Sequence, residues 1–266
     1  MATKLGTRTS YSKLSTWLRC PRKYRLRYID DAPEERTAVA LVFGTAIHEA
    51  CELFFEGIKA GAPPSSDEVH GAFHRAFTDS VKLAEDMHVP MDWGKTNQAD
   101  MIEKGEAMMA VFLDEVDRGV RVVGTEVPFE FEIAPGRVVN GVIDLVLDDG
   151  NGRYRVVDIK TAASTYGPDR IDYDQQPTVY IAAAEHLYGA HGNVDFEYWL
   201  LLKTKKPQLK IMPVVRDAND RAELIQTIDE VETARAHGVY PRIRGFMCTG
   251  CEYRQLCRTE LEGGDS

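Results

Sequence analysis

The hydrophobic pattern of this chain changes its period near residue 121. Before that point, apolar residues recur three and four positions apart, which is the spacing of amphipathic helices. Beyond it, three segments alternate between apolar and polar residues, and turn-forming residues separate them. The segments are 121–133, 138–147 and 153–160. The sequence therefore predicts a helical region followed by three antiparallel strands joined by short turns.

Helices and two more strands are predicted around this meander. Ser10 suits the N-cap of a first helix, Pro21 suits the first turn of a second, and Gly61 follows the third. The predicted helices are 11–19, 21–28, 44–59, 67–84, 97–118, 173–189 and 218–237, and the further strands are 194–202 and 208–215. This order of elements is typical of a mixed α/β fold.

The chain is long enough to bury one full-sized hydrophobic core, since it has 266 residues. We therefore expect a single domain, residues 1–266, with three parts. A helical region covers 10–120, the core sheet covers 121–215, and a C-terminal helix with a cysteine-rich segment covers 216–266.

The composition is that of an ordinary soluble globular protein, with 44% hydrophobic and 28% charged residues. No segment approaches the run of about 20 apolar residues that a membrane-spanning helix needs. The first ten residues also lack the apolar stretch of a signal peptide. We therefore expect a cytoplasmic protein with no membrane partner.

Charge is unevenly distributed along the chain, whose formal net charge is −10. Residues 19–28 carry +5, residues 203–210 carry +4 and residues 242–258 carry +3, so the remainder carries −22. The net acidity argues against a nonspecific basic coat protein of nucleic acid, because attraction to phosphate depends on Lys and Arg. Each basic segment is either a solvated face or part of a local basic groove.

Two carboxylates and a lysine stand out in the second and third predicted strands. Asp158 and Lys160 are two residues apart and point to the same face, and a hairpin brings Asp144 beside them. Adjacent carboxylates repel, and a divalent cation between them relieves that repulsion. A lysine beside them can stabilise charge on a phosphate or polarise water. A cross-strand salt bridge of Lys160 with either aspartate explains the three residues alone equally well.

Four other polar residues are candidates for the same site. His48 is a candidate third metal ligand, although a lone helical histidine is more often a surface residue or satisfied within the fold. Gln176 and Tyr180 are four residues apart and share one helix face. Glu126, at the start of the first predicted strand, is a candidate partner of the metal ligands.

The five cysteines indicate a metal or cluster site rather than a disulfide framework, because their number is odd and no export signal precedes them. Cys248, Cys251 and Cys257 form a C-x2-C-x5-C pattern, and a tetrahedral centre requires a fourth ligand. Cys51 lies on an apolar helical face and is expected in the core, so Cys20 is the better fourth ligand. Zinc and an iron–sulfur cluster are both compatible with four thiolates.

Five short motifs occur in one order along the chain. They are Y-S-K-L-S-T-W-L-R-C-P-R-K-Y at 11–24, G-T-A-I-H at 44–48, G-V-I-D at 141–144, D-I-K at 158–160 and Q-x-x-x-Y at 176–180. Over about residues 10–258 they resemble the RecB-like branch of the PD-(D/E)XK nuclease superfamily. One departure is Ile143, which replaces the proline of the signature, as is common in this branch. The resemblance implies a restriction-endonuclease-like core.

The resemblance also implies roles for the matched residues. The implied ligands of Mg²⁺ or Mn²⁺ are His48, Asp144, Asp158 and the carbonyl of Ile159. Lys160 would be the catalytic lysine, and Gln176 and Tyr180 would face the active site and help position DNA.

A cluster is implied by the same resemblance. In the RecB-like nucleases of helicase–nuclease complexes and in the CRISPR-associated exonucleases, one cysteine precedes the nuclease core and three follow it. Cys20, Cys248, Cys251 and Cys257 match that pattern, which implies a four-iron four-sulfur cluster joining the two ends of the chain. We expect its role to be structural, with electron transfer as the alternative.

The implied function is hydrolysis of phosphodiester bonds by a metal-dependent exodeoxyribonuclease. The implied substrate is single-stranded DNA ends, in recombination, repair or end processing, within a prokaryotic or phage-infected cell. One alternative is a DNA-binding subunit of a helicase or CRISPR adaptation complex, in which cutting is secondary. Another is a cluster protein that senses redox state. An oligomer, including a ring, is compatible with each.

Overall fold

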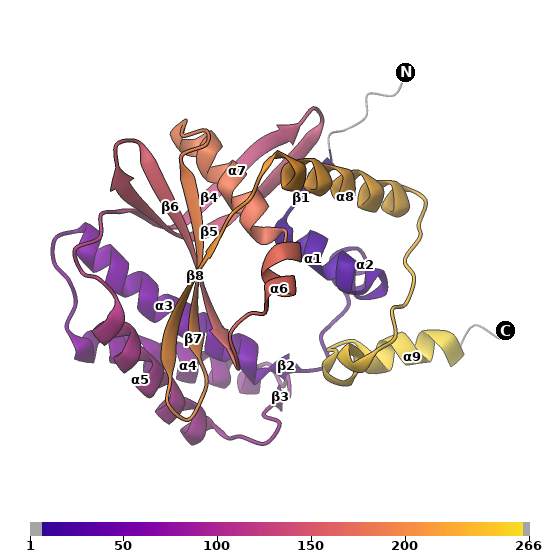
Figure 1. Cartoon of the computed structure of the whole chain (residues 1–266). Coiled ribbons are helices and arrows are strands. Elements are labelled where there is room, and N and C mark those ends of the chain that lie inside the picture. Colours follow the sequence, from indigo (N-terminus) through magenta and orange to yellow (C-terminus); the bar gives the residue numbers. More distant parts are fainter. Residues whose placement is uncertain (1–6, 263–266) are drawn as a thin grey trace.

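One mixed sheet organises the fold (Figure 1), and this computed structural model describes residues 7–262. The longest strand, β5 (Arg137–Gly150), pairs antiparallel with β4 (Val122–Ala134) on one side. On its other side it pairs antiparallel with β6 (Arg153–Ala162) and, near its start, parallel with β1 (Thr7–Thr9). The predicted three-strand meander is therefore confirmed, and β1 adds a strand that the sequence did not indicate.

Two more strands extend the sheet beyond β6. β7 (Val194–Leu202) runs parallel to β6, and β8 (Gln208–Val214) runs antiparallel to β7. The parallel pair requires a crossover connection, which α6 (Pro168–Tyr173) and α7 (Gln176–Tyr188) supply. A separate pair of two-residue strands, β2 (Thr37–Ala38) and β3 (Met91–Asp92), lies among the helices.

Helices cover both faces of the sheet and bury alternate residues of its strands. Leu145 and Leu147 of β5 pack under α3, α4 and α5, whereas Val146 packs on the opposite face with α1, α7 and α8. The bounds are α1 Tyr11–Arg19, α2 Pro21–Tyr28, α3 Val39–Lys59, α4 Ser66–Asp86, α5 Gln98–Glu115 and α8 Ala218–Ala236. This arrangement confirms the predicted mixed α/β class, with helices on either side of the sheet in Figure 1.

One predicted helix boundary is wrong, and one short helix was not predicted. The predicted helix 173–189 corresponds to α7, which begins three residues later with Pro177 in its first turn, and the additional helix α6 precedes it across the extended residue Asp174. The helix predicted from residue 44 begins at Val39, because Val42 and Phe43 continue its buried face. The remaining predicted helices and strands are confirmed to within three residues at each end.

The C-terminal segment returns to the N-terminal helices. It forms a short 3-10 helix, η1 (Phe246–Gly250), and then α9 (Arg254–Glu262). The amide of Arg22 donates to the carbonyl of Pro241, and the carboxylate of Glu35 accepts from the first backbone amides of α9. The two ends of the described chain are therefore held together by hydrogen bonds that involve no cofactor.

The described helices include none that is both long enough and apolar enough to cross a membrane. The longest of them, α3 and α4, have 21 residues each, and both contain several charged residues. They pack on the sheet through one apolar face.

We predict that Gly105→Ala destabilises the protein. Gly105 of α5 faces the buried ring of Phe73, and a Cβ atom there would lie 1.9 Å from the nearest ring carbon. Overpacking of this kind costs about 1–3 kcal/mol, more than the helix preference for alanine returns. The free energy of unfolding in urea measures the loss.

The matched control is Gly71→Ala in α4. There the new methyl group meets only the far end of the Arg75 side chain, at 3.1 Å. The control should be neutral or stabilising by up to about 1 kcal/mol. An equal decrease in the free energy of unfolding of both variants would contradict tight packing between α4 and α5.

Candidate active site and cysteine cavity

The ends of the β5–β6 ladder bring two carboxylates together. The ladder pairs Leu145 with Val157, and beyond this pair the strands separate. The side chain of Asp144 fills the gap, since its Oδ2 accepts the backbone amide of Ile159 at 2.9 Å. Asp144 and Asp158 consequently lie on adjacent strands where side chains replace backbone pairing.

Asp158 is fully buried, with 0% of its surface exposed. Its Oδ1 accepts from the Lys160 Nζ at 2.8 Å and from the Gln176 Nε2 at 2.7 Å. Its Oδ2 is also buried and has no hydrogen-bond partner in the described structure. An unpartnered buried carboxylate oxygen is costly, so this atom points to an absent ligand that binds carboxylates.

The charges of this group are set by burial and by each other. Burial raises the pKa of Asp158 to about 7, against the attraction of Lys160. Burial acts to lower the pKa of Lys160, but the attraction of Asp158 and Asp144 outweighs it and the pKa is raised. Lys160 therefore keeps its proton and is a fixed positive charge beside two carboxylates.

Two further ligand residues, His48 and Glu126, lie next to Asp144. One ligand atom each from His48, Glu126 and Asp144 lies within 4.8 Å of the other two. The Nδ1 atom of His48, from α3, is 3.4 Å from the Oδ2 atom of Asp144. Burial lowers the pKa of His48, which favours the neutral imidazole that binds metals. One imidazole and two carboxylates form a donor set that suits a divalent ion.

Glu126 joins this group through an unusual backbone conformation. It lies on β4 between Thr125, which pairs with Leu145, and Val127, which pairs with Ile143, so it stands opposite Asp144. Its φ of 43° lies in the left-handed region, which is strained for a residue with a side chain. Desolvation and the repulsion of Asp144 and Glu52 raise the pKa of Glu126 to about 7. A cation would relieve this repulsion.

The sequence-predicted residues are therefore only partly brought together. His48, Asp144 and Glu126 form the group of close ligand atoms, whereas Asp158 is not a member of it. The backbone of Ile159, the residue after Asp158, contacts this group twice, through its amide to Asp144 and through a hydrogen bond with His48. Glu126, expected only as a partner of the ligands, is placed at ligand distance.

Gln176 and Tyr180 share one face of α7 behind Asp158. Gln176 is 4% exposed and Tyr180 is 9% exposed, and the two side chains are hydrogen-bonded to each other. Burial raises the pKa of Tyr180, which therefore stays protonated. Their contacts fix the orientation of Asp158, and a role in positioning DNA stays a prediction.

A hollow of about 440 Å³ opens over the ligand group. Its polar walls are Thr45, His48, Glu49, Glu52, Glu126 and Asp144. Asp158 lies outside this hollow and is fully buried, so the ligand group faces solvent whereas Asp158 does not. Such a site can bind a cation together with a charged substrate.

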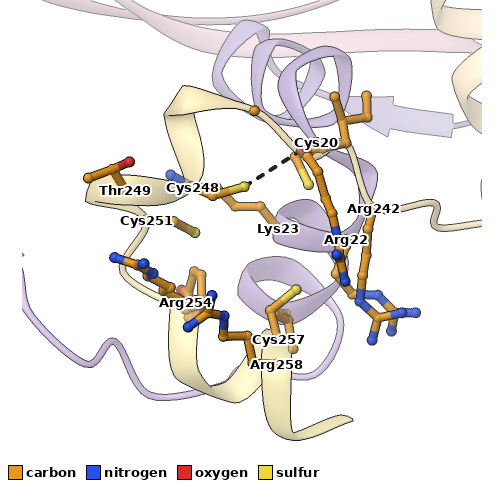
Figure 2. Close-up of a pocket in the computed structure, with 15 residues that line it drawn as sticks. Cys20, Arg22, Lys23, Arg242, Cys248, Thr249, Cys251, Arg254, Cys257 and Arg258 are labelled. Carbon is orange, nitrogen blue, oxygen red and sulfur yellow. Dashed lines mark hydrogen bonds between the residues drawn. The ribbon is translucent and has the colours of Figure 1, made fainter. Parts of the chain in front are cut away.

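Four cysteines line a second cavity, of about 300 Å³, where the C-terminal segment meets α2 (Figure 2). They are Cys20, Cys248, Cys251 and Cys257, and Figure 2 shows them around a common space among arginine side chains. Cys51 is 1% exposed in the core, which confirms that prediction. The sequence therefore separated the four candidate ligands from the core thiol.

The spacing of the sulfurs bears on the occupant of this cavity. Among these four described thiols, no three have Sγ atoms that all lie within 4.8 Å of one another. Tetrahedral zinc would hold its sulfurs closer, about 3.8 Å apart, because the Zn–S bond is about 2.3 Å. In this structure the four described thiols are therefore not gathered as closely as the sulfurs of a closed zinc site.

Comparison with known proteins addresses the family. The sequence profile of the PD-(D/E)XK nuclease superfamily matches residues 8–258. A search of curated proteins finds no significant match. The crystal structure of a candidate exonuclease from Eubacterium rectale superposes with a TM-score of 0.60 at 16% identity, covering 96% of this chain and 92% of that one. That similarity supports the fold.

A second solved structure, SSO0001, is also 16% identical and covers 94% of this chain and 96% of that chain. Its TM-score of 0.37 is too low to support a structural comparison. The profile match, in contrast, spans nearly the whole described chain and includes every candidate site residue. The family predicted from the five motifs is confirmed: this chain belongs to the PD-(D/E)XK nuclease superfamily.

Proposed function

We propose that the protein is a metal-dependent DNA exonuclease that hydrolyses single-stranded ends. The observation that carries this proposal is the buried Asp158, held by Lys160 and Gln176 with one oxygen left unpartnered beside the His48, Glu126 and Asp144 group. The superfamily supplies the reaction class, hydrolysis of phosphodiester bonds with divalent ions. The structural neighbour from Eubacterium rectale, named as a candidate exonuclease, supports the preference for ends.

The residues present fit a magnesium or manganese ion. His48, Asp144, Glu126, the Oδ2 atom of Asp158 and the carbonyl of Ile159 would hold it. When bound, the ion supplies positive charge to the scissile phosphate and acidifies a water molecule. Lys160 holds a proton throughout and places its charge where negative charge develops on the phosphate. Gln176 keeps Asp158 oriented through its 2.7 Å hydrogen bond.

We further propose that the four cysteines bind a four-iron four-sulfur cluster with a structural role. Four cysteines on one cavity supply the four thiolates that such a cluster needs, and the guanidinium groups around them suit its negative charge. In this proposal the C-terminal part, residues 216–266, completes a single nuclease domain by attaching to α2.

Lys160→Ala should lower the turnover number for Mn²⁺-dependent hydrolysis by about 10²- to 10³-fold, because it removes a preorganised charge from the phosphate site. Release of nucleotides from an end-labelled single strand measures this rate. Lys82→Ala, on the exposed surface of α4, is the matched control and should retain full activity. A circular single strand of the same sequence should resist the wild type. Equal degradation by Lys160→Ala and wild type would contradict the assigned role.

Mn²⁺ should raise the melting temperature of the wild type, because only the folded chain gathers the ligand group. Free ion at a hundredfold excess over its dissociation constant corresponds to about 2.7 kcal/mol. We expect Asp144→Asn to lose most of this gain, measured for each protein as the difference between Mn²⁺ and EDTA. Asp79→Asn, exposed on α4, should keep it. An unchanged gain in Asp144→Asn would place the ion elsewhere.

Protein purified without oxygen should be brown and contain about four iron atoms per chain. Cys257→Ser should lose most of the iron, because it removes one of the four thiolates that line the cavity. Cys51→Ala is the matched control, because this thiol is buried away from the cavity and its loss should leave the iron content unchanged. Colourless protein with one zinc per chain would overturn the cluster assignment.

A further inference from the structure

A third pocket, separate from the hollow over the ligand group and from the cysteine cavity, lies between α1 and the α6–α7 corner, close to the candidate active site. It has a volume of about 300 Å³ and is lined by Tyr11, Leu18, Arg19, Arg170, Tyr173 and Asp174 among others. We name it the α1–α6 pocket. Its position matters because one wall of the pocket is connected by hydrogen bonds to Asp158, the carboxylate that the proposed reaction requires.

Hydrogen bonds connect this pocket to Asp158. The Tyr11 hydroxyl donates to the Asp174 Oδ1 at 2.7 Å, and the same oxygen accepts the backbone amide of Gln176 at 3.0 Å. The side chain of Gln176 then donates to Asp158. One residue of α7 thus separates the pocket wall from the active-site carboxylate.

The wall formed by α6 is held in place from behind. The buried guanidinium of Arg216 donates to the carbonyls of Ile171 and Asp174 at the end of this short helix. The guanidinium of Arg170 lies 3.5 Å from the centre of the Tyr166 ring, which is itself buried. The pocket is therefore preformed, and a ligand would not have to order it.

The pocket exposes an aromatic ring and two unpaired cations. Tyr173 is 81% exposed and Leu18 is 50% exposed, so apolar surface is open to solvent here. Within the described chain, neither Arg19 nor Arg170 forms an ion pair with a carboxylate, although most arginines of the basic segment 19–28 do. The acidic neighbours of Arg170 in α6, Asp169 and Asp172, do not line the pocket.

The charge of Asp174 does not oppose an anionic ligand strongly. Its Oδ1 already accepts two hydrogen bonds, from Tyr11 and from the backbone of Gln176, and so it is turned into the protein. The remaining polar groups of the wall are the hydroxyl of Ser15 and the amide of Gln175. The charged groups that line the pocket are Arg19 and Arg170 against Asp174, so the lining carries one net positive charge beside one exposed ring.

We propose that the α1–α6 pocket binds one unpaired nucleotide of the substrate strand next to the cleavage site, an inference that rests on the proposed function. A base stacks on Tyr173, and Arg19 and Arg170 contact the flanking phosphates. Single-stranded nucleic acid is recognised by this combination of stacking platform and cations, since every base has a face to stack. A pocket of about 300 Å³ is too small for a base-paired helix, so binding in it would select single strands.

The test measures the dissociation constant of a labelled oligothymidylate by fluorescence anisotropy in EDTA. Tyr173→Ala should bind about tenfold more weakly, because stacking on one aromatic ring contributes a factor of this size. Tyr173→Phe should bind within about twofold of the wild type, since the ring is kept. Arg19→Ala and Arg170→Ala should each lower the slope of log affinity against log salt by about 0.7.

Arg75→Ala is the matched control, because Arg75 is exposed on α4 and lies outside the α1–α6 pocket. Its affinity and salt slope should equal those of the wild type. The proposal would be overturned if Tyr173→Ala and the double variant Arg19→Ala, Arg170→Ala both bind the oligothymidylate with the affinity of the wild type.

Hydrolysis is measured in parallel so that the two proposals fail separately. If the wild type cleaves DNA, the KM of Tyr173→Ala should rise about tenfold while kcat changes less than about twofold. Loss of affinity in the variants without hydrolysis by the wild type would uphold the pocket and refute the nuclease assignment. Hydrolysis by the wild type together with unchanged binding in the variants would uphold the nuclease assignment and refute the pocket.

Discussion

The buried contact of Asp158 with Lys160 and Gln176 is the interaction on which the rest of the site depends. A carboxylate with no exposed surface is stable only with partners, and here they come from its own strand and from the start of α7. The need to present Gln176 explains why α7 begins where it does and why α6 is a separate helix. The same break between the two helices positions Asp174, which forms part of the wall of the α1–α6 pocket.

Much of the fold could be predicted from the sequence because local rules and packing agree. Alternation fixed the faces of β5 and β6, and caps such as Ser10 fixed helix ends. The short helix α6 that precedes Asp174 was not predicted. The strands β1 to β3 are too short to carry a pattern, and α9 depends on a cap from Glu35, 220 and 221 positions from the two amides that it accepts. Such partners are invisible before the chain folds.

The residues of the candidate site also differ in whether the sequence alone could reveal them. Asp144, Asp158 and Lys160 stood out because charged residues are unusual inside a sheet, and His48 was recovered only through the motif that contains it. Glu126 reaches the ligand group because of its left-handed backbone, which no sequence pattern announces. The structure also changes the interpretation of the basic segments. Glu252 pairs with Lys23, and Glu260 pairs with both Arg22 and Arg242, so net charge along the sequence overstates the cations available to DNA.

The cysteine cavity joins residues that are far apart along the chain. Cys248, Cys251 and Cys257 follow Cys20 by more than 200 residues. Closing so long a loop is entropically unfavourable unless the sheet and the helices between these cysteines have folded. A group that fills the cavity would therefore enter after that part of the chain has folded. Occupancy of the cavity would thus report that folding of the intervening chain is complete.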